Sequence, residues 1–241
     1  MSGKAVTTEN GKEIKRIGII AAMEEEILLL RKQMQNCQTE VIAGTEYDLG
    51  RIGAYEVVLM QCGIGKVSAA LGAQAMILRY QPDCIINTGC AGAMAKGLKI
   101  GGMVVSDATV EWDIDLLALG MPRGFVSAMN GVEMKADSAL ADWIISAIPA
   151  DQQICRGLVV SGDQFVSRPE QREIILGAFP GALCAEMEGG AIGHVCAQNG
   201  VPFCVVRCMS DTADGDSDVN FAVFVKEAGE KSASILLSLL K

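Results

Sequence analysis

The chain has 241 residues, half of them hydrophobic and only 5% aromatic, which suits one large or two small α/β domains with a core of Ala, Val, Ile, Leu and Met. The formal net charge of −9 argues against binding to nucleic acid or to an anionic membrane, because both carry phosphate groups that require basic patches. No apolar run reaches the roughly 18 residues that a membrane-spanning helix needs.

The predicted elements alternate between strands and helices along the chain. The first fifteen residues lack the apolar stretch of a signal peptide, and we expect them to be a loose leader before a domain over residues 16–241. Apolar runs and helical patterns then predict a strand at 17–21, a helix at 23–33, two strands of a hairpin within 47–61, a helix at 67–80, strands at 84–87 and 102–106, a helix at 137–148, a strand at 158–161, a helix at 169–177, a strand at 183–185, a helix from 188, a strand at 203–208 and a helix at 221–240.

This alternation predicts a single-domain three-layer α/β/α sandwich with a central mixed sheet. In α/β folds, ligands gather at the carboxyl ends of the strands. Polar residues and glycines cluster after the predicted strands, at 24–26, 63–65, 89–92, 162–163, 186–190 and 210–211. Six loops could therefore line one cleft.

Nine cysteines are spread over the chain without a CxxC pair. Many of them lie in apolar runs such as PFCVVRC, which indicates small buried thiols in a reducing compartment, and hence a cytoplasmic protein. The single histidine, His194, lies in a helical pattern and is expected to be structural. A zinc site would need paired Cys or His residues, so no metal is expected.

Two glycine-rich stretches resemble nucleotide-binding motifs but lack required residues. In GIGKVS (63–68), Lys66 is followed by valine, and the upstream glycine of a P-loop is missing. In NTGCAGAM (87–94), Gly89 and Gly92 are three residues apart, which does not match G-x-G-x-x-G. Both stretches are better explained as tight turns, and a nicotinamide cofactor is not expected.

Acidic residues follow three of the predicted strands. AEMEGGAIG (185–193) places Glu186 and Glu188 between apolar runs, where each charge costs several kcal/mol unless the chain or a ligand binds it. The run 24–26 is EEE at a predicted helix start, which helix-dipole stabilisation of about 1 kcal/mol or less explains. Asp211 could be an ordinary helix N-cap. A functional site requires that these acids meet in one cleft.

Six segments of the chain carry a family resemblance when they are taken together. They are IGIIAAMEEE, GIGKVSAALGA, INTGCAGAM, GLVVSGDQFV, AEMEGGAIGHVC and VVRCMSDTAD. In this order and without large gaps from about Arg16 to the C-terminus, they resemble the methylthioadenosine/S-adenosylhomocysteine nucleosidases of the nucleoside phosphorylase superfamily. The resemblance implies a nucleoside phosphorylase-like domain over residues 16–241.

That family hydrolyses the N-glycosidic bond between adenine and a 5′-thio-substituted ribose. The resemblance therefore implies a hydrolase with a small-molecule nucleoside substrate, an oxocarbenium-like transition state and no cofactor. It assigns Asp211 as the general acid on adenine, which an apolar site supports by raising the carboxyl pKa. It assigns Glu26 as the base that activates water, and Glu188 as the residue that binds the ribose hydroxyls and favours the cationic ring.

The resemblance also implies a set of substrate-binding positions. Phe165 would stack on adenine, Val166 would present backbone groups to its edge, and Met187 would lie under the ribose. Met23 and Ile64 would line the sugar and the thio-alkyl side. The complete set is Met23, Ile64, Cys90, Gly92, Phe165, Val166, Glu186, Met187, Glu188, Arg207, Ser210 and Phe221. Taken singly, each apolar member could equally be part of the core.

Two of these positions face the attacking water, and one closes the site. Arg207 and Cys90 would lie near the water, and a buried Arg207 would need an acidic partner, either Glu186 or Glu26. Phe221 would close one end of the pocket. The family often has serine in place of the cysteine.

The segment EWDIDLLALGMPRG (111–124) resembles the family's dimer-contact loop in outline, although Trp112 and Leu119 differ from the expected residues. In the family this loop contributes to the alkylthio end of the pocket. The resemblance therefore implies a homodimer.

Two other functions stay open. A purine nucleoside phosphorylase would transfer the ribosyl group to phosphate, which needs a positively charged cradle. The loop after the first strand instead carries three glutamates and no arginine. A non-catalytic nucleoside-binding protein could also use this fold, but such a protein has no need to keep all three acids.

Overall fold

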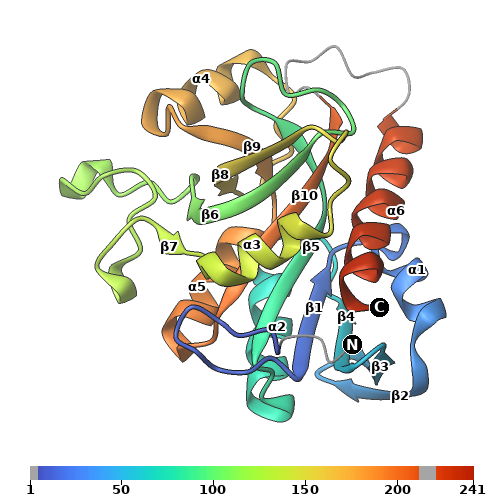
Figure 1. The fold of residues 1–241 in the computed structure, drawn as a ribbon. Helices are drawn as coiled ribbons and strands as arrows, with labels where there is room; N and C mark the ends of the chain where they lie inside the picture. Colours follow the sequence, from blue (N-terminus) through green and yellow to red (C-terminus); the bar gives the residue numbers. More distant parts are fainter. Residues whose placement is uncertain (1–4, 212–220) are drawn as a thin grey trace.

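The computed structural model describes residues 5–211 and 221–241, apart from the side chains of residues 221–223. In this described part of the chain, ten strands form one mixed sheet (Figure 1). The strands are β1 (Arg16–Ala21), β2 (Gln35–Ile42), β3 (Thr45–Ile52), β4 (Tyr55–Gln61), β5 (Cys84–Ala93), β6 (Met103–Glu111), β7 (Met134–Lys135), β8 (Ile154–Ser161), β9 (Ala182–Glu186) and β10 (Phe203–Asp211).

Half of the sheet is closed on itself. The strand order is β10-β6-β8-β9-β5-β1-β4-β3-β2, and β5 also pairs with β10, so that β5, β10, β6, β8 and β9 form a ring. Strands β1, β5 and β10 are adjacent and parallel, so their carboxyl ends lie at the same edge. The last residues of β9 pair with the last residues of β5, which brings the end of β9 to that edge as well.

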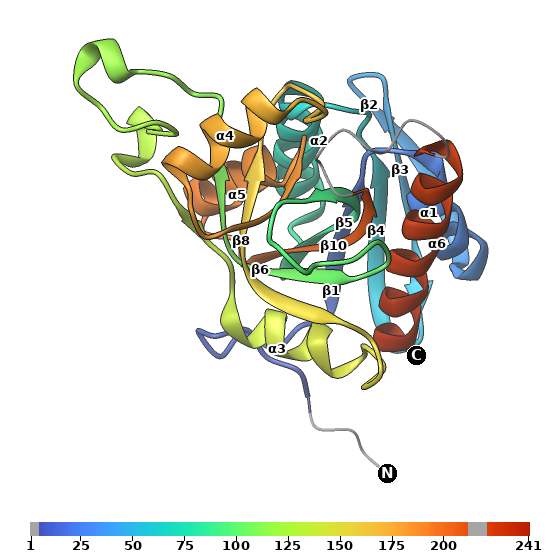
Figure 2. The same ribbon diagram turned by 90° about the horizontal axis from the view of Figure 1, so that it is seen from above.

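Helices cover both faces of the sheet and make the three layers that the alternating pattern predicts (Figures 1 and 2). Buried side chains of α1, α3 and α6 share one core cluster with β1 and β10, and those of α2 and α5 share another. A smaller cluster lies under α4. The helices are α1 (Glu24–Gln33), α2 (Lys66–Tyr80), α3 (Ser138–Ser146), α4 (Pro169–Ala178), α5 (Gly189–Asn199) and α6 (Phe221–Leu240).

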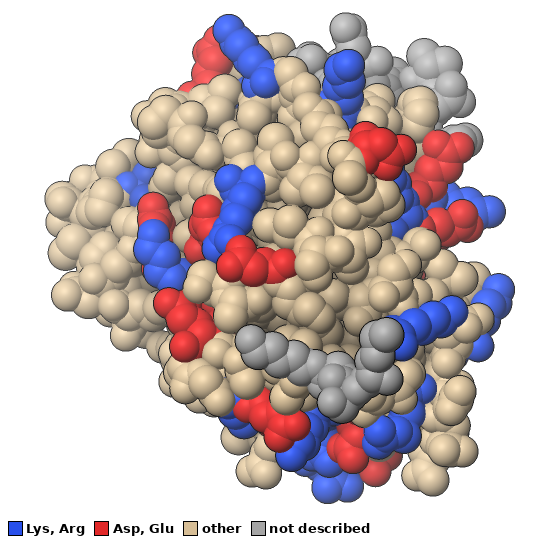
Figure 3. Space-filling view, viewed as in Figure 1, with Lys and Arg blue, Asp and Glu red and all other residues tan. Residues whose placement is uncertain are grey.

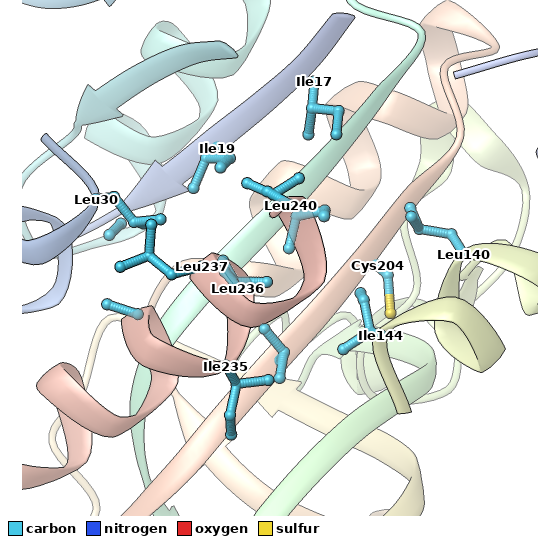
Figure 4. Close-up of a cluster of buried hydrophobic side chains, with 14 of the residues drawn as sticks. Ile17, Ile19, Leu30, Leu140, Ile144, Cys204, Ile235, Leu236, Leu237 and Leu240 are labelled. Carbon is cyan, nitrogen blue, oxygen red and sulfur yellow. The ribbon is translucent and has the colours of Figure 1, made fainter. Parts of the chain in front are cut away.

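Helix α6 closes the first of these clusters (Figure 4). Its residues Leu236 and Leu240 are 0% and 1% exposed and pack with Ile17 and Ile19 of β1 and Leu30 of α1. The C-terminal helix therefore holds in place both the first strand and the helix that follows it.

Between β6 and β7 the chain leaves the body of the molecule as a projecting segment, residues 112–133 (Figure 2). It contains two short 3-10 helices, Leu117–Leu119 and Ser127–Met129. No helix among the described residues combines the length and the apolar character that crossing a bilayer demands.

The predicted leader is not loose where the structure describes it. Residues 5–15 fold back on themselves through a bridge between Thr7 and Glu13, and the backbone N–H of Glu9 donates to Asp137 Oδ2 of the domain at 2.9 Å. Ile14 is only 4% exposed and belongs to the core cluster under α6. The buried side chain of Ile14, two residues before β1, anchors this segment.

The predicted elements occur in the predicted order, with differences at β2, at β5 and at the short strand β7, which was not predicted. Strand β2 was not predicted, because its residues 35–42 are mostly polar and exposed at the end of the sheet, where they need no apolar alternation. Strand β5 continues past Asn87 to Ala93, where the sequence TGCAG suggests a turn.

Candidate active site

A buried arginine gathers the acidic residues at the carboxyl edge of the sheet. Arg207 of β10 is 1% exposed, and its Nη2 forms an ion pair with Glu186 and lies 3.4 Å from Glu188 Oε2. The same Nη2 donates to Asn87 Oδ1 at 2.6 Å. Burial alone would lower the pKa of Arg207, but the two carboxylates raise it, so the guanidinium stays charged.

Glu186 and Glu188 adopt different roles although only one residue separates them. Glu186 ends β9, and its Oε2 accepts the backbone N–H groups of Glu188 at 3.1 Å and of Gly189 at 2.8 Å. Glu188 is the N-cap residue of α5, and its Oε1 accepts the N–H of Gly65 at 2.9 Å. Both carboxylates are buried and face Arg207, so they do not form a surface turn. Of the two acidic partners expected for Arg207, Glu186 is confirmed.

Glu188 is held near its point of ionisation. Burial raises its pKa to about 7; Arg207 opposes this effect and the charge of Glu186 adds to it. The side chain can therefore exchange a proton near neutral pH.

Glu26 is buried although it belongs to a run of three glutamates. It is 1% exposed, whereas Glu24 and Glu25 are exposed. Its Oε2 accepts the N–H groups of Ala22 at 2.9 Å and Met23 at 3.0 Å, and its Oε1 accepts the N–H of Cys90 at 2.9 Å. Helix-dipole stabilisation at the surface therefore explains the first two glutamates but not the third.

Cys90 links this carboxylate to the arginine. Its backbone carbonyl accepts from Arg207 Nη1 at 3.3 Å, while its N–H donates to Glu26. Burial raises the pKa of the Cys90 thiol far above its ordinary value, and the nearby Glu26 charge adds to this. The thiol therefore stays protonated and is a weak donor, unlike a reactive thiolate.

A pocket opens beside these residues at the ends of β5, β9 and β10. Asp211 is 3% exposed, lies opposite Gly92 of β5, and its Oδ2 is 3.2 Å from Ser210 Oγ. The cavity volume of this pocket is about 30 Å³. Its lining consists of Gly92, Gln164, Phe165, Val166, Ala185, Glu186, Met187 and Asp211.

The segment after β8 forms one wall of this pocket. Phe165 is 49% exposed although it is aromatic, and Val166 is buried. Gln171, in the first turn of α4, donates from Nε2 to the carbonyl of Phe165 at 3.3 Å and to Gln164 Oε1 at 3.1 Å. The start of α4 thus fixes a segment that presents an aromatic ring to the pocket.

A family model and a sequence relative both place this chain among known proteins. The model of the phosphorylase superfamily matches residues 16–241. A 5′-methylthioadenosine/S-adenosylhomocysteine nucleosidase of Geobacillus kaustophilus is 39% identical over 227 residues, which cover 93% of this chain and 96% of the relative. The chain belongs to this nucleosidase family.

Solved structures of the nucleosidase family share the fold. The enzyme of Neisseria meningitidis, in complex with methylthio-immucillin-A, superposes with a TM-score of 0.91 at 35% identity and covers 95% of this chain and 99% of its own. The S. pneumoniae enzyme, with the transition-state inhibitor MT-ImmA, superposes with a TM-score of 0.88 at 37% identity and covers 94% and 98% of the two chains.

Most of the predicted site residues come together at this edge of the sheet. Glu186 joins two groups, since it contacts Arg207 and also lines the pocket. The first group is Glu26, Cys90, Glu188 and Arg207, and the second is Gly92, Phe165, Val166, Met187, Ser210 and Asp211.

Three predicted residues remain, and of these Met23 contacts the first group through its backbone N–H. Met23 is half-buried at the N-cap of α1, where its backbone N–H binds Glu26. Ile64 is 59% exposed beside Gly65. The side chain of Phe221 lies outside the described residues.

Two residues that bind these charged groups were not among the predicted site residues, although the loop 63–65 was predicted to line the cleft. Asn87 binds Arg207, and a polar residue at the end of the apolar run CIIN was a usable signal. Gly65 supplies the N–H that binds Glu188, and it lies in the GIGK stretch that the sequence explains as a tight turn.

Proposed function

We propose that the chain hydrolyses the N-glycosidic bond of 5′-methylthioadenosine and S-adenosylhomocysteine, and releases adenine and the thio-substituted ribose. The observation that carries the proposal is the burial of Glu26, Glu188 and Asp211 around one edge of the sheet, beside a pocket with an exposed aromatic ring. The names of the relatives, and the complexes of the two solved structures with methylthio-immucillin-A and with the transition-state inhibitor MT-ImmA, support this substrate class.

The proposed reaction uses each carboxyl group for one task. Asp211 donates a proton to N7 of adenine while the bond between C1′ and N9 breaks. Glu26 accepts a proton from the water whose oxygen bonds to C1′. Glu188 accepts hydrogen bonds from the ribose hydroxyls, and its negative charge stabilises the oxocarbenium-like ring.

The remaining positions would form the walls of the nucleoside site. We assign the adenine to Phe165 and Val166 and the underside of the ribose to Met187. Met23, Ile64 and Phe221 would surround the 5′-thio substituent. The further members, as proposed from the family, are Cys90, Gly92, Glu186, Arg207 and Ser210.

Water rather than phosphate is the proposed nucleophile. Phosphate requires a cation that is free to bind it. Arg207, the guanidinium beside Glu26, is already paired with Glu186 and Glu188, and an added dianion would meet three buried carboxylates. This arrangement disfavours a phosphorylase.

We also propose that the chain is a cytoplasmic homodimer. All nine cysteines are free thiols, which suits a reducing compartment. An apolar stripe on α2, formed by Val67, Leu71 and Leu78, is 67–71% exposed. The lobe at the left of Figure 3, which is the projecting segment, shows few charged side chains, and its Leu119 is 73% exposed. Exposed apolar surfaces of this kind indicate a protein partner.

The direct experiment compares adenine or hypoxanthine release from 5′-methylthioadenosine, S-adenosylhomocysteine and inosine, with and without added phosphate. For each of the two thio-nucleosides, we expect the rate of adenine release to be the same with and without phosphate. Inosine should give little product. Strict dependence on phosphate, or a preference for inosine, would instead identify a phosphorylase. Binding of the nucleosides without any turnover would identify a non-catalytic binding protein.

A further inference from the structure

A second cluster of buried charges lies at the start of α2. Lys66 Nζ is 2.6 Å from Asp113 Oδ1 and 3.0 Å from Glu111 Oε2, and all three side chains are at most 15% exposed. The other oxygen of Glu111, Oε1, is 2.9 Å from His194 Nδ1. Burial alone would lower the pKa of Lys66, but its bonds to the two carboxylates raise it, so the ammonium stays charged.

This cluster fixes the segment that leads to the adenine wall. Asp113 Oδ2 accepts the backbone N–H of Asp163 at 2.8 Å, while its Oδ1 binds Lys66 Nζ. Asp163 Oδ1 in turn accepts the backbone N–H of Lys66 at 2.7 Å. Three hydrogen bonds therefore join three chain segments, at residues 66, 113 and 163, and Phe165 follows Asp163 by two residues.

The same short loop also binds the ribose carboxylate. The residue before Lys66 is Gly65, whose N–H donates to Glu188 Oε1 at 2.9 Å. Its φ is +104°, and an added Cβ would lie 3.1 Å from Asp163 Oδ1, so glycine lets the loop reach both neighbours. One dipeptide thus contacts the proposed sugar side and the proposed adenine side of the site.

We propose that Lys66 is a positioning residue that holds the ribose carboxylate Glu188 and the adenine segment 163–166 in one fixed geometry. This inference rests on the proposed function. Lys66 does not line the pocket described above; it acts through Asp113 and Asp163. A misplacement of about 1 Å in a binding group can cost about 10²-fold in rate, so a charged anchor for this loop has a direct kinetic effect.

The test uses Lys66→Met and Asp113→Asn, with Lys66→Arg as the conservative variant. We expect Lys66→Met and Asp113→Asn to raise KM for 5′-methylthioadenosine by about tenfold or more and to weaken adenine binding, measured by calorimetry, by a similar factor. The kcat at saturating substrate should change less than KM, because the two acids proposed to transfer protons, Glu26 and Asp211, are untouched. Lys66→Arg should restore most of the lost affinity.

Lys135→Met is the matched control, since Lys135 is exposed and pairs only with Glu133 among the described contacts. It should behave as the wild type. If Lys66→Met does not fold, the KM and the adenine affinity of Asp113→Asn test the proposal, because that substitution keeps the shape of the side chain.

Provided that the wild type hydrolyses its substrate, two results would overturn the inference. In the first, the variants have a lower melting temperature but keep the wild-type KM and adenine affinity, which would make the cluster merely structural. The other is a rise in KM without any loss of adenine affinity, which would disconnect Lys66 from the adenine segment. A wild type that releases no adenine would instead refute the proposed function itself.

Discussion

Glu188 is a buried acid whose ionisation changes near neutral pH. Its folded-state pKa is raised from 4.5 to about 7, chiefly by burial. A carboxyl group with a raised pKa stabilises the fold while it is protonated, below its unfolded pKa, and this contribution is lost as the pH rises through the folded pKa. The window of change therefore runs from roughly pH 4.5 to 7.

Replacing Glu188 by Gln keeps the neutral form at every pH. We expect the melting temperature of Glu188→Gln, relative to the wild type, to rise between pH 5 and pH 8 by at least about 2–4 °C. The variant should also lose the increase in kcat/KM that ionisation of Glu188 gives the wild type over this range. Melting curves and initial rates at several pH values check both. A stability difference that is independent of pH would contradict the assigned pKa.

Asp211 is proposed to act in the chemical step rather than in binding. Asp211→Asn retains the shape of the side chain but removes the acidic proton. We expect kcat to fall by about 10²–10⁴-fold, the usual effect of losing a general acid, while nucleoside affinity stays within about threefold. Single-turnover rates and equilibrium binding measure the two effects separately. Normal turnover would remove Asp211 from the acid role.

At the scale of the elements, the site depends on a close approach between β5, β10 and α1. Gly89 of β5 lies where Arg207 Nη1 and Glu26 Oε1 meet, and an added Cβ would collide with both. The three elements can therefore bring a guanidinium and a carboxylate over this strand only because the residue has no side chain.

Gly89→Ala should consequently displace both functional groups. We expect a loss of about 1–3 kcal/mol in the free energy of unfolding from overpacking, together with a loss of hydrolysis. Gly177→Ala in α4 is the matched control, because an added Cβ meets nothing within 4 Å there. Urea unfolding and adenine release compare the two variants. Wild-type activity in Gly89→Ala would show that this contact is not critical.

The sequence predicts helices and strands well where an apolar run or a helical pattern is clear, and poorly where neither is present. Strands such as β1 and β10 are nearly continuous apolar runs, and α2 has a clear helical pattern, so all three were predicted. Strand β2 is polar and exposed at the sheet edge, so it has no such signal. In the site, the residue types were predictable from the sequence. The hydrogen bonds from Asn87 and Gly65 were not, because they join segments about 120 residues apart that only the folded chain brings together.

At the scale of the whole molecule, the stripe on α2 is proposed to bury itself in a homodimer. Val67, Leu71 and Leu78 are spaced by four and seven residues and therefore share one face of the helix. The wild type should sediment at twice the 25.4 kDa chain mass, and Leu71→Asp should shift the protein to the monomer. Val41→Asp, at an exposed apolar residue on β2, is the control and should stay dimeric. A monomeric wild type would contradict the dimer.

The central claim is that buried acids from distant parts of the chain surround a single purine nucleoside. A crystal structure of Asp211→Asn with 5′-methylthioadenosine tests it most directly. The account predicts adenine against Phe165, the ribose hydroxyls within about 2.6–3.2 Å of Glu188, and a water between C1′ and Glu26. A nucleoside bound elsewhere, or bound here with its ribose turned away from Glu188, would contradict the account.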